Sequence, residues 1–399
     1  MNNVNHDAIA LDAPHQADRL GLEQAGALAL FGMAGAVQFS IAVAQILAAV
    51  ACACWLGVVV TNHEPAVRAP RMFWPLALYA ALTLVSAAFS PQPQTSFMDC
   101  KQLVLFLLVP VTYRLMNESR AHTLVSVVMS LGAVSAVFGI IQYGILHYDT
   151  LGQRPQGTLS HYMTYSGLLM LVISIALARI LFGRRERVWA MLIMPALLVA
   201  ISLTQTRNAW MGVLAAVALL LSLKDFRLLA ALPLVAAIFF GIAPTRFMSI
   251  FDRNNPTSRD RIAMLEEGWH MIADHPLVGV GPNMVQQRYA DYRVSTAVEQ
   301  VNPHLHNVPV QIAAERGLPA LAAWIVFVVM LFLDLCRGVR IPSERFFAAV
   351  GLASVVAMLA AGLFEYNFGD SEFLMSLLIL VTLPFAVRRA KTENLALKT

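Results

Sequence analysis

Long apolar runs separated by short polar connections dominate the sequence. A helix needs roughly 20 apolar residues to cross the hydrocarbon core, because a bilayer offers no hydrogen-bond partners to exposed backbone groups. Strands of a membrane barrel would alternate apolar and polar residues, and these runs do not. Of the 399 residues 58% are hydrophobic and only 13% are charged. The sequence therefore predicts an all-α polytopic membrane protein.

Twelve apolar runs are candidate transmembrane helices. They cover residues 25–37, 39–60, 73–90, 100–116, 122–144, 164–182, 187–203, 208–223, 227–244, 317–336, 346–366 and 372–387. The first run is short, so residues 25–60 form either one long helix or a half-helix followed by a full one. The two options place the later loops on different sides of the membrane, and the charge distribution must decide between them.

Positive charge is distributed unevenly between the connections. With the N-terminus in the cytoplasm, the short outer loops contain only Lys101, Arg154 and Arg207, while the other side collects most arginines and lysines. Cytoplasmic loops are enriched in these residues. The distribution favours twelve spans with cytoplasmic tails at residues 1–24 and 388–399. It also explains the net charge of +4 without a nucleic-acid partner.

One connection, residues 245–316, is much longer than the others. It separates spans 1–9, within residues 25–244, from spans 10–12, within residues 317–387. On this topology it lies on the outer, periplasmic side, where long loops are translocated whatever their charge. We therefore expect it to form a small extramembrane cap.

Helical periodicity is present within this loop. Apolar residues recur at spacings of three and four over residues 258–275, which predicts an amphipathic helix beginning at Ser258 and ended by Pro276. Shorter helical segments are expected over residues 283–293 and from residue 306 into the next span. The predicted apolar face consists of Ile262, Leu265, Trp269 and Ile272.

The loop contains arginines but no lysine. Guanidinium groups bind phosphate oxygens with two parallel hydrogen bonds and stay charged when partly desolvated, so this choice suits a diphosphate at a membrane surface. The alternative is that many of them pair with acids of the same loop. The loop arginines are Arg246, Arg253, Arg259, Arg261, Arg288, Arg293 and Arg316.

Arg207 lies in LTQTRNAW, the whole connection between two spans. A cation near the outer interface is costly unless it has a ligand or a partner. It either binds an anionic ligand or extends to a lipid phosphate.

Two histidines, His304 and His306, stand two residues apart in NPHLHN. A zinc site would need a third ligand from elsewhere, such as His161, so we expect neither a metal nor another cofactor. One imidazole can instead act as a general base toward a sugar hydroxyl, because its pKa lies near working pH.

Further polar residues flank these histidines or a span end. Asn307, Gln311 and Glu315 follow at steps of four on one helical face, where they orient substrate or the imidazole ring, or simply form a solvated stripe. Glu365, at membrane depth, is a functional candidate, although pairing with an arginine is the favoured role.

Three motifs in this order, LTQTRNAW, HPLVGVGPN fourteen residues after Arg261, and HLHNVPVQIAAERGLPA, resemble those of the O-antigen ligase and polymerase superfamily. The resemblance covers residues 200–330 by motif and the rest by topology. It implies a GT-C-like transferase that moves a glycan from undecaprenyl diphosphate at the periplasmic face of the bacterial inner membrane. In the ligase branch the acceptor is a lipid A core sugar, and the reaction inverts the anomeric carbon without metal or nucleotide.

The resemblance also implies roles for individual residues. The histidine directly before asparagine, His306, is the expected base, and Arg207 and Arg261 are the expected diphosphate ligands. Arg259 is the competing alignment for Arg261. The expected substrate-binding residues are Arg288, chosen on charge alone, Arg259, His304, Asn307, Gln311 and Glu365.

Other functions remain open at this level. A polymerase would use another carrier-linked glycan as acceptor, and a protein O-oligosaccharyltransferase would use a hydroxyl side chain. From a different class, a transporter of the lipid-linked glycan would place polar groups near the membrane midplane, often in repeated halves. Here they gather at the outer edge, which favours the transferase over a transporter or a structural scaffold.

Overall fold

A computed structural model describes residues 6–61, 68–242, 245, 248 and 255–396, with side chains from residue 21 onward. All regular elements in this part of the chain are helices. In chain order they are α1 (His6–Ala36), α2 (Ile41–Thr61), α3 (Phe73–Ala88), α4 (Pro93–Asp99), the 3-10 helix η1 (Cys100–Leu107), α5 (Leu108–Leu115), α6 (Glu118–Gly144), α7 (Tyr162–Phe182), α8 (Arg187–Leu203), α9 (Arg207–Lys224), η2 (Phe226–Ala231), α10 (Leu232–Ile242), α12 (Pro256–Asp274), α13 (Val285–Tyr292), α14 (Val308–Arg340), α15 (Arg345–Gly362), η3 (Asn367–Gly369) and α16 (Ser371–Ala396).

Eight helical segments in the described residues are long and apolar enough to cross a membrane, which agrees with a polytopic membrane protein. They are Ile41–Thr61, Pro93–Leu115, Glu118–Gly144, Tyr162–Phe182, Arg207–Lys224, Val308–Arg340, Arg345–Gly362 and Ser371–Ala396. Three shorter apolar helices, Phe73–Ala88, Arg187–Leu203 and Phe226–Ile242, coincide with further predicted spans. The count of twelve spans stays a prediction.

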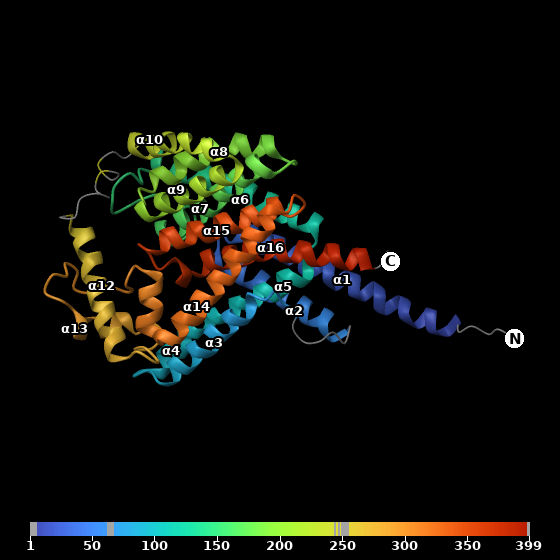
Figure 1. Cartoon of the computed structure of the whole chain (residues 1–399), viewed down its shortest axis with the longest axis horizontal. Coiled ribbons are helices and arrows are strands. Elements are labelled where there is room, and N and C mark those ends of the chain that lie inside the picture. Colours follow the sequence, from blue (N-terminus) through green and yellow to red (C-terminus); the bar gives the residue numbers. More distant parts are fainter. Residues whose placement is uncertain (1–5, 62–67, 243–244, 246–247, 249–254, 397–399) are drawn as a thin grey trace.

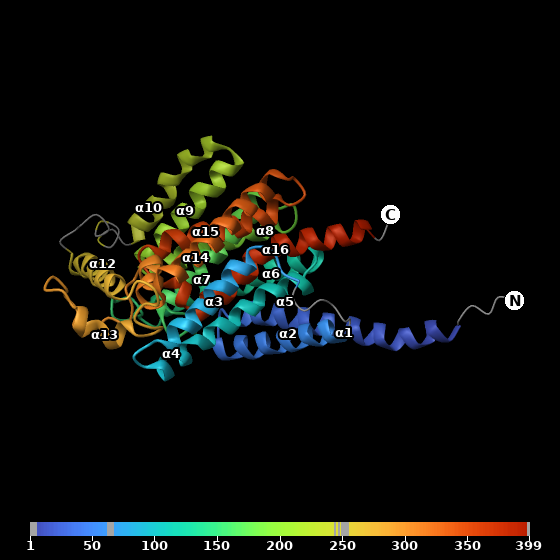
Figure 2. The same ribbon diagram turned by 60° about the horizontal axis from the view of Figure 1, so that its bottom comes forward.

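The ambiguous region 25–60 consists of two helices. α1 ends at Ala36, and α2 begins at Ile41 and packs along it (Figure 2). The alternative of one long helix is therefore wrong. α1 also begins at His6, so most of the predicted tail 1–24 belongs to a helix.

The bundle is elongated, and its two ends differ (Figure 1). α12 and α13 lie at one end, while the described chain ends lie at the other in both views. α15 and α16 occupy the centre, where the α16 residues 372–387 are all buried. Large apolar side chains such as Ile46, Leu78 and Leu192 are exposed, as expected of a surface that faces lipid.

Basic residues at the end of the bundle where α14 and α16 finish are held in ion pairs. Arg71 and Arg337 both donate to Asp334, at 3.0 and 2.9 Å. Arg388 donates to Glu344 through Nε at 2.9 Å. These pairs gather cations at the same end as the chain termini.

The connection between α12 and α13 is hydrogen-bonded to a kink in α14. Gly317, with φ +82°, interrupts the helical backbone of α14. The N–H groups of Val280 and Gly281 donate to the carbonyls of Ala314 and Glu315 at 2.8 and 2.9 Å. A Cβ on Gly279, which has φ +67°, would lie 2.2 Å from the Glu315 carbonyl carbon, so only glycine fits. We call the contact between residues 276–281 and this kink the glycine hook.

Candidate active site

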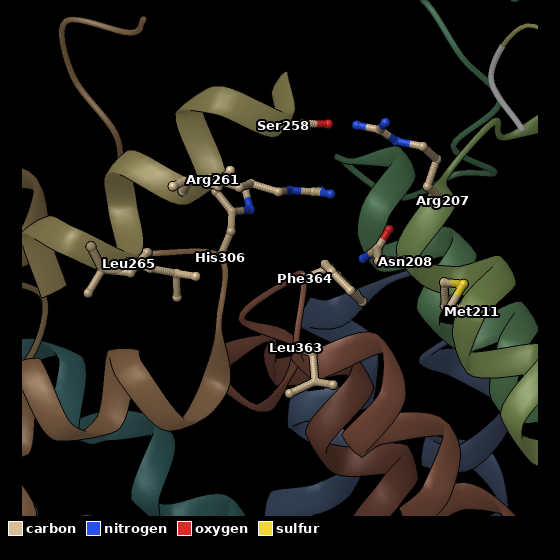
Figure 3. A pocket seen from close by; sticks show the side chains of 11 residues that line it. Arg207, Asn208, Met211, Ser258, Arg261, Leu265, His306, Leu363 and Phe364 are labelled. Atoms are coloured by element: carbon tan, nitrogen blue, oxygen red, sulfur yellow. The ribbon is translucent and has the colours of Figure 1, made fainter. Parts of the chain in front are cut away.

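A cavity of about 240 Å³ opens between α12 and the beginning of α9. Figure 3 shows Arg207 and Arg261 extending from opposite walls toward the space between them, with His306 beside Arg261. We call it the arginine cavity. Its lining residues are Arg207, Asn208, Met211, Ser258, Arg261, Ile262, Leu265, Leu305, His306, Leu363 and Phe364.

Arg207 is the first residue of α9 and is buried. The turn that leads to it is fixed by Trp210, whose indole N–H donates to the Ile201 carbonyl at 3.1 Å. The Trp210 ring stacks on Phe239 with centroids 5.2 Å apart. The positive N-terminal end of α9 therefore adds to the guanidinium charge at this wall of the cavity.

Arg261 lies on α12 and has its guanidinium carbon 6.0 Å from the centroid of the Phe364 ring. The ring belongs to the segment that follows α15, so this contact joins two walls of the cavity. Its competitor in the sequence alignment, Arg259, is exposed and does not line the cavity.

The burial of α12 differs from the predicted face. Ile262, Leu265 and Trp269 are exposed, whereas Asp260 and Glu267 are buried. The two carboxylates accept hydrogen bonds from backbone N–H groups of the segment after α13, at Val294, Val298 and Glu299. A buried acid is stable where it meets such donors, so these non-local contacts override the apolar pattern.

The start of α12 also differs from the prediction. The N-cap is Asn255, whose side chain accepts from the Thr257 N–H at 3.0 Å, and Pro256 follows at the first helical position. Ser258, the predicted cap, lies inside the helix and lines the arginine cavity instead.

His306 has a left-handed backbone, with φ +49°, which is uncommon for a residue other than glycine. Its neighbours hold it there. The Leu305 N–H donates to Gln311 Oε1 at 2.6 Å. Asn307 caps α14 by accepting from the Val310 N–H and donates to the Leu363 carbonyl. Gln311 and Asn307 thus position the histidine segment.

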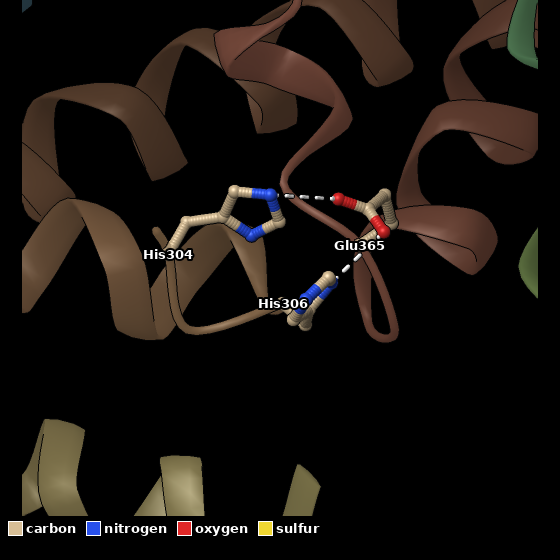
Figure 4. A group of neighbouring side chains, drawn as sticks. All are labelled: His304, His306 and Glu365. Carbon is tan, nitrogen blue, oxygen red and sulfur yellow. Dashed lines mark hydrogen bonds and ion pairs between the residues drawn. The ribbon is translucent and has the colours of Figure 1, made fainter. Parts of the chain in front are cut away.

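Glu365 lies behind His306 and makes contact with both histidines (Figure 4). Its Oε2 is 2.9 Å from His306 Nδ1, and its Oε1 is 3.4 Å from His304 Nε2. The two imidazole rings are 4.1 Å apart between centroids. We call these three residues the histidine cluster. The sequence favoured a pairing of Glu365 with an arginine; in the structure its described ion pairs are with the two imidazoles, and Arg261 acts on it through its charge.

Charge at the cluster is set by burial and by these contacts. Burial alone would raise the pKa of Glu365, but the hydrogen bond from His306 and the charges of His306, His304 and Arg261 lower it to about 2. Burial lowers the pKa of His304 to about 4, against the opposing effect of Glu365. At neutral pH Glu365 is ionised and His304 is neutral.

An ionised carboxylate can only accept a hydrogen bond, so His306 Nδ1 must carry the proton that faces Glu365. When the imidazole is neutral, its Nε2 then has a free lone pair. A carboxylate that fixes the tautomer in this way prepares a histidine to act as a base.

The same three side chains could hold a metal ion, since their ligand atoms lie within 4.8 Å of one another. The sequence offered no acidic third ligand near the histidines, because Glu365 is 59 residues from His306. Three protein ligands also match a catalytic zinc site, so a direct test must separate the two readings.

Residues 196–325 match a family model described as O-antigen ligase. The match supports the O-antigen ligase and polymerase superfamily. The matched stretch contains Arg207, Arg261 and His306, whereas Glu365 lies beyond it. The superfamily supports a transferase of the O-antigen ligase or polymerase type acting on lipid-linked glycans. No curated protein matches the chain.

The other described arginines of the loop do not line the arginine cavity. Arg288, on α13, donates to Asp291 at 2.7 Å. Arg293 donates to the carbonyls of Ala297 and Glu299. Arg316 is buried, with Nη1 2.6 Å from Glu315 Oε2 and Nη2 3.2 Å from Asp99 Oδ2. Arg246 and Arg253 lie outside the described residues.

Sequence reasoning missed several contributors to the cavity, among them the polar residues Asn208 and Ser258 and the aromatic Phe364. Asn208 had a visible signal, because it directly follows Arg207 at a helix start. The other two had none, since their relation to the cavity depends on how α12 and the segment after α15 pack together.

Proposed function

We propose that the protein is an O-antigen ligase, which transfers a glycan from undecaprenyl diphosphate to a hydroxyl of a lipid A core sugar. The observation that carries this proposal is the meeting of Arg207, Arg261 and His306 in one cavity, with Glu365 bonded to the histidine. The matched family stretch supports the same class of reaction.

Arg207 and Arg261 bind the diphosphate of the donor. Two guanidinium groups on facing walls stabilise the negative charge that develops on the leaving group, without any proton transfer. The apolar lining at Met211, Ile262 and Leu265 suits the first part of the lipid chain.

His306 acts on the acceptor. Its Nε2 takes the proton of the acceptor hydroxyl while that oxygen forms a bond to the anomeric carbon of the donor sugar. The bond from this carbon to the diphosphate oxygen breaks, and undecaprenyl diphosphate leaves with the electron pair. Attack opposite the leaving group inverts the anomeric carbon. The imidazolium is stabilised by Glu365 and then releases its proton to solvent.

The orientation follows from the distribution of cations. The ion-paired arginines lie at the end of the bundle that holds the chain termini, and such residues are enriched on the cytoplasmic side. We infer that both termini are cytoplasmic. The arginine cavity then lies on the periplasmic side of a bacterial inner membrane, within reach of carrier-linked glycans and membrane lipids.

The test is transfer by the purified protein in lipid vesicles that contain an undecaprenyl-diphosphate glycan and lipid A core, without ATP. The wild type should form glycosylated core. His306→Ala should reduce the rate by about 10²–10⁴, the usual contribution of a general base. His270→Ala, an exposed histidine of α12, is the matched control and should keep the rate.

Three results would overturn parts of the proposal. Product formed only on a second carrier-linked glycan, or on a protein hydroxyl, would make the enzyme a polymerase or a protein transferase. Movement of the donor across the vesicle without product would make it a transporter. Loss of activity with a chelator, restored by zinc, would replace the base at the histidine cluster with a metal.

A further inference from the structure

A second cavity, of about 390 Å³, lies on the other side of the histidine cluster. Its walls are the beginnings of α7 and α9, the connection between α15 and α16, and the segment before α14 that contains Pro303 and His304. We call it the carboxylate cavity. Its polar lining residues are His161, Thr164, Asn208, His304, Glu365, Tyr366, Asn367 and Asp370.

The charge of this cavity is opposite to that of the arginine cavity. Its lining includes two carboxylates, Glu365 and Asp370, and neither arginine nor lysine. Asp370 accepts hydrogen bonds from the Thr164 hydroxyl and the Phe373 N–H. A phosphate or carboxylate ligand would be repelled here, whereas neutral hydroxyl groups can donate to these oxygens.

Two lining residues have buried acceptor atoms with no hydrogen-bond partner among the described residues: His304 Nδ1 and Asn367 Oδ1. The Asn367 amide N–H₂ already donates to the Met358 carbonyl at 3.0 Å. His304 directs Nε2 toward Glu365, so its Nδ1 is the acceptor of a neutral ring. Buried acceptors without donors are rare in proteins, so both atoms have hydrogen-bonding capacity beside the cavity that the described residues leave unused.

The remaining lining suits a sugar ring. Tyr366 and Phe373 contribute aromatic surface, and Met163 and Met170 contribute apolar surface. A pyranose presents hydroxyls around its edge and C–H groups on its faces, so it needs both kinds of contact.

The two cavities meet where the chemistry is proposed. Asn208 lines both of them. Glu365 lines the carboxylate cavity and bonds to His306, which lines the arginine cavity. A sugar in the carboxylate cavity therefore lies next to the boundary that Asn208 and the histidine cluster form between the two cavities, where its hydroxyl can meet both the base and the donor.

We propose that the carboxylate cavity binds the acceptor, as a neutral sugar ring whose hydroxyls bond to Asp370, Asn367 and His304. This assignment rests on the proposed transferase function and divides the substrates between the cavities: the diphosphate of the donor in one and a neutral sugar ring of the acceptor in the other. Asp370 and Asn367 are acceptor-binding residues that lie outside the matched family stretch.

The test measures binding of two probes to the full-length protein in detergent: deacylated lipopolysaccharide core oligosaccharide, and undecaprenyl diphosphate. Asp370→Asn and Thr164→Val keep the size of each side chain. Both should weaken oligosaccharide binding at least tenfold and change undecaprenyl diphosphate binding less than twofold. Asp274→Asn, at the exposed end of α12, is the matched control and should change neither.

Asn367→Ala gives a second route if one substitution prevents folding, and Arg207→Ala should show the reverse pattern. Unchanged oligosaccharide binding in folded Asp370→Asn and Thr164→Val proteins would overturn the assignment. Weaker binding of undecaprenyl diphosphate in these variants would mean that this cavity serves the lipid diphosphate, and would also overturn the assignment. A wild type that transfers no glycan to any acceptor would refute the proposed function itself.

Discussion

The two cavities that flank the histidine cluster differ in charge and in construction. The arginine cavity is formed between α12 and the helix bundle, so its shape depends on how α12 is held in place. The carboxylate cavity is formed by the ends of bundle helices, by the connection between α15 and α16, and by Pro303 and His304 of the segment before α14, without any residue of α12. Donor binding therefore depends directly on the position of α12, whereas most of the acceptor site belongs to the bundle.

Among the tests that compare the two cavities, the largest effect is expected at the arginine cavity. Arg207→Ala should lower the transfer rate by about 10²–10³, because a fixed cation that stabilises the leaving group is lost. Steady-state kinetics with varied donor will check this result. Arg288→Ala is the matched control and should change the rate less than about twofold, because its guanidinium is paired with Asp291 away from both cavities. Equal losses of transfer rate in both variants would show that the rate depends on the net positive charge of the protein rather than on the position of Arg207 in the cavity.

The next effect tests whether the arginine cavity, but not the carboxylate cavity, depends on the glycine hook. Gly279→Ala places a Cβ against the backbone of Glu315 at positive φ, which costs at least about 1–3 kcal/mol and should detach the glycine hook. The protein should begin to unfold at a lower temperature. The rate of glycan transfer should fall, while the affinity for core oligosaccharide should be kept. Gly152→Ala, where no atom lies within 4 Å of the new Cβ, should be neutral. Parallel loss of binding to both substrates would mean that the cavities are not built independently.

The smallest effect concerns pH and the histidine on the carboxylate side. The folded protein keeps His304 neutral down to about pH 4, whereas in the unfolded chain it binds a proton near pH 6.5. Stability should therefore fall as pH drops below 6.5, by at most about 2 kcal/mol at pH 5. Glu365, with a pKa lowered to about 2, stabilises the folded protein fully above about pH 4.5, and this contribution is lost only as the pH falls below that value. His304→Gln should reduce the decline in melting temperature between pH 7 and 5. A decline equal to that of the wild type would contradict the lowered pKa of His304.

Much of the fold could be predicted because lipid imposes a simple rule on apolar runs. The predicted run at residues 187–203 coincides with α8, and the run at 208–223 differs from α9 by one residue at each end. The rule failed outside the bundle. On α12 the apolar residues Ile262 and Trp269 are exposed, because Asp260 and Glu267 are buried against backbone donors far away in sequence.

The candidate site shows the same division. Local motifs identified Arg207, Arg261 and His306, which the structure places in one cavity. Asn307 and Gln311 were expected to orient substrate or the imidazole ring, or to form a solvated stripe. In the structure Asn307 caps α14 and Gln311 holds the backbone at Leu305, so both position the histidine segment; a role in substrate binding stays a prediction. No pattern in the sequence could pair Glu365 with His306, since only packing of α14 against α15 brings them together.

The central claim is that Glu365 holds His306 in the tautomer that leaves Nε2 free. Glu365→Gln tests it most directly, because the amide can donate to Nδ1 and move the ring proton to Nε2. In single-turnover reactions with saturating donor, the transfer rate should fall by about 10²–10⁴, while donor binding is kept or strengthened by the loss of a negative charge. A folded Glu365→Gln protein that transfers glycan at the wild-type rate would contradict the claim.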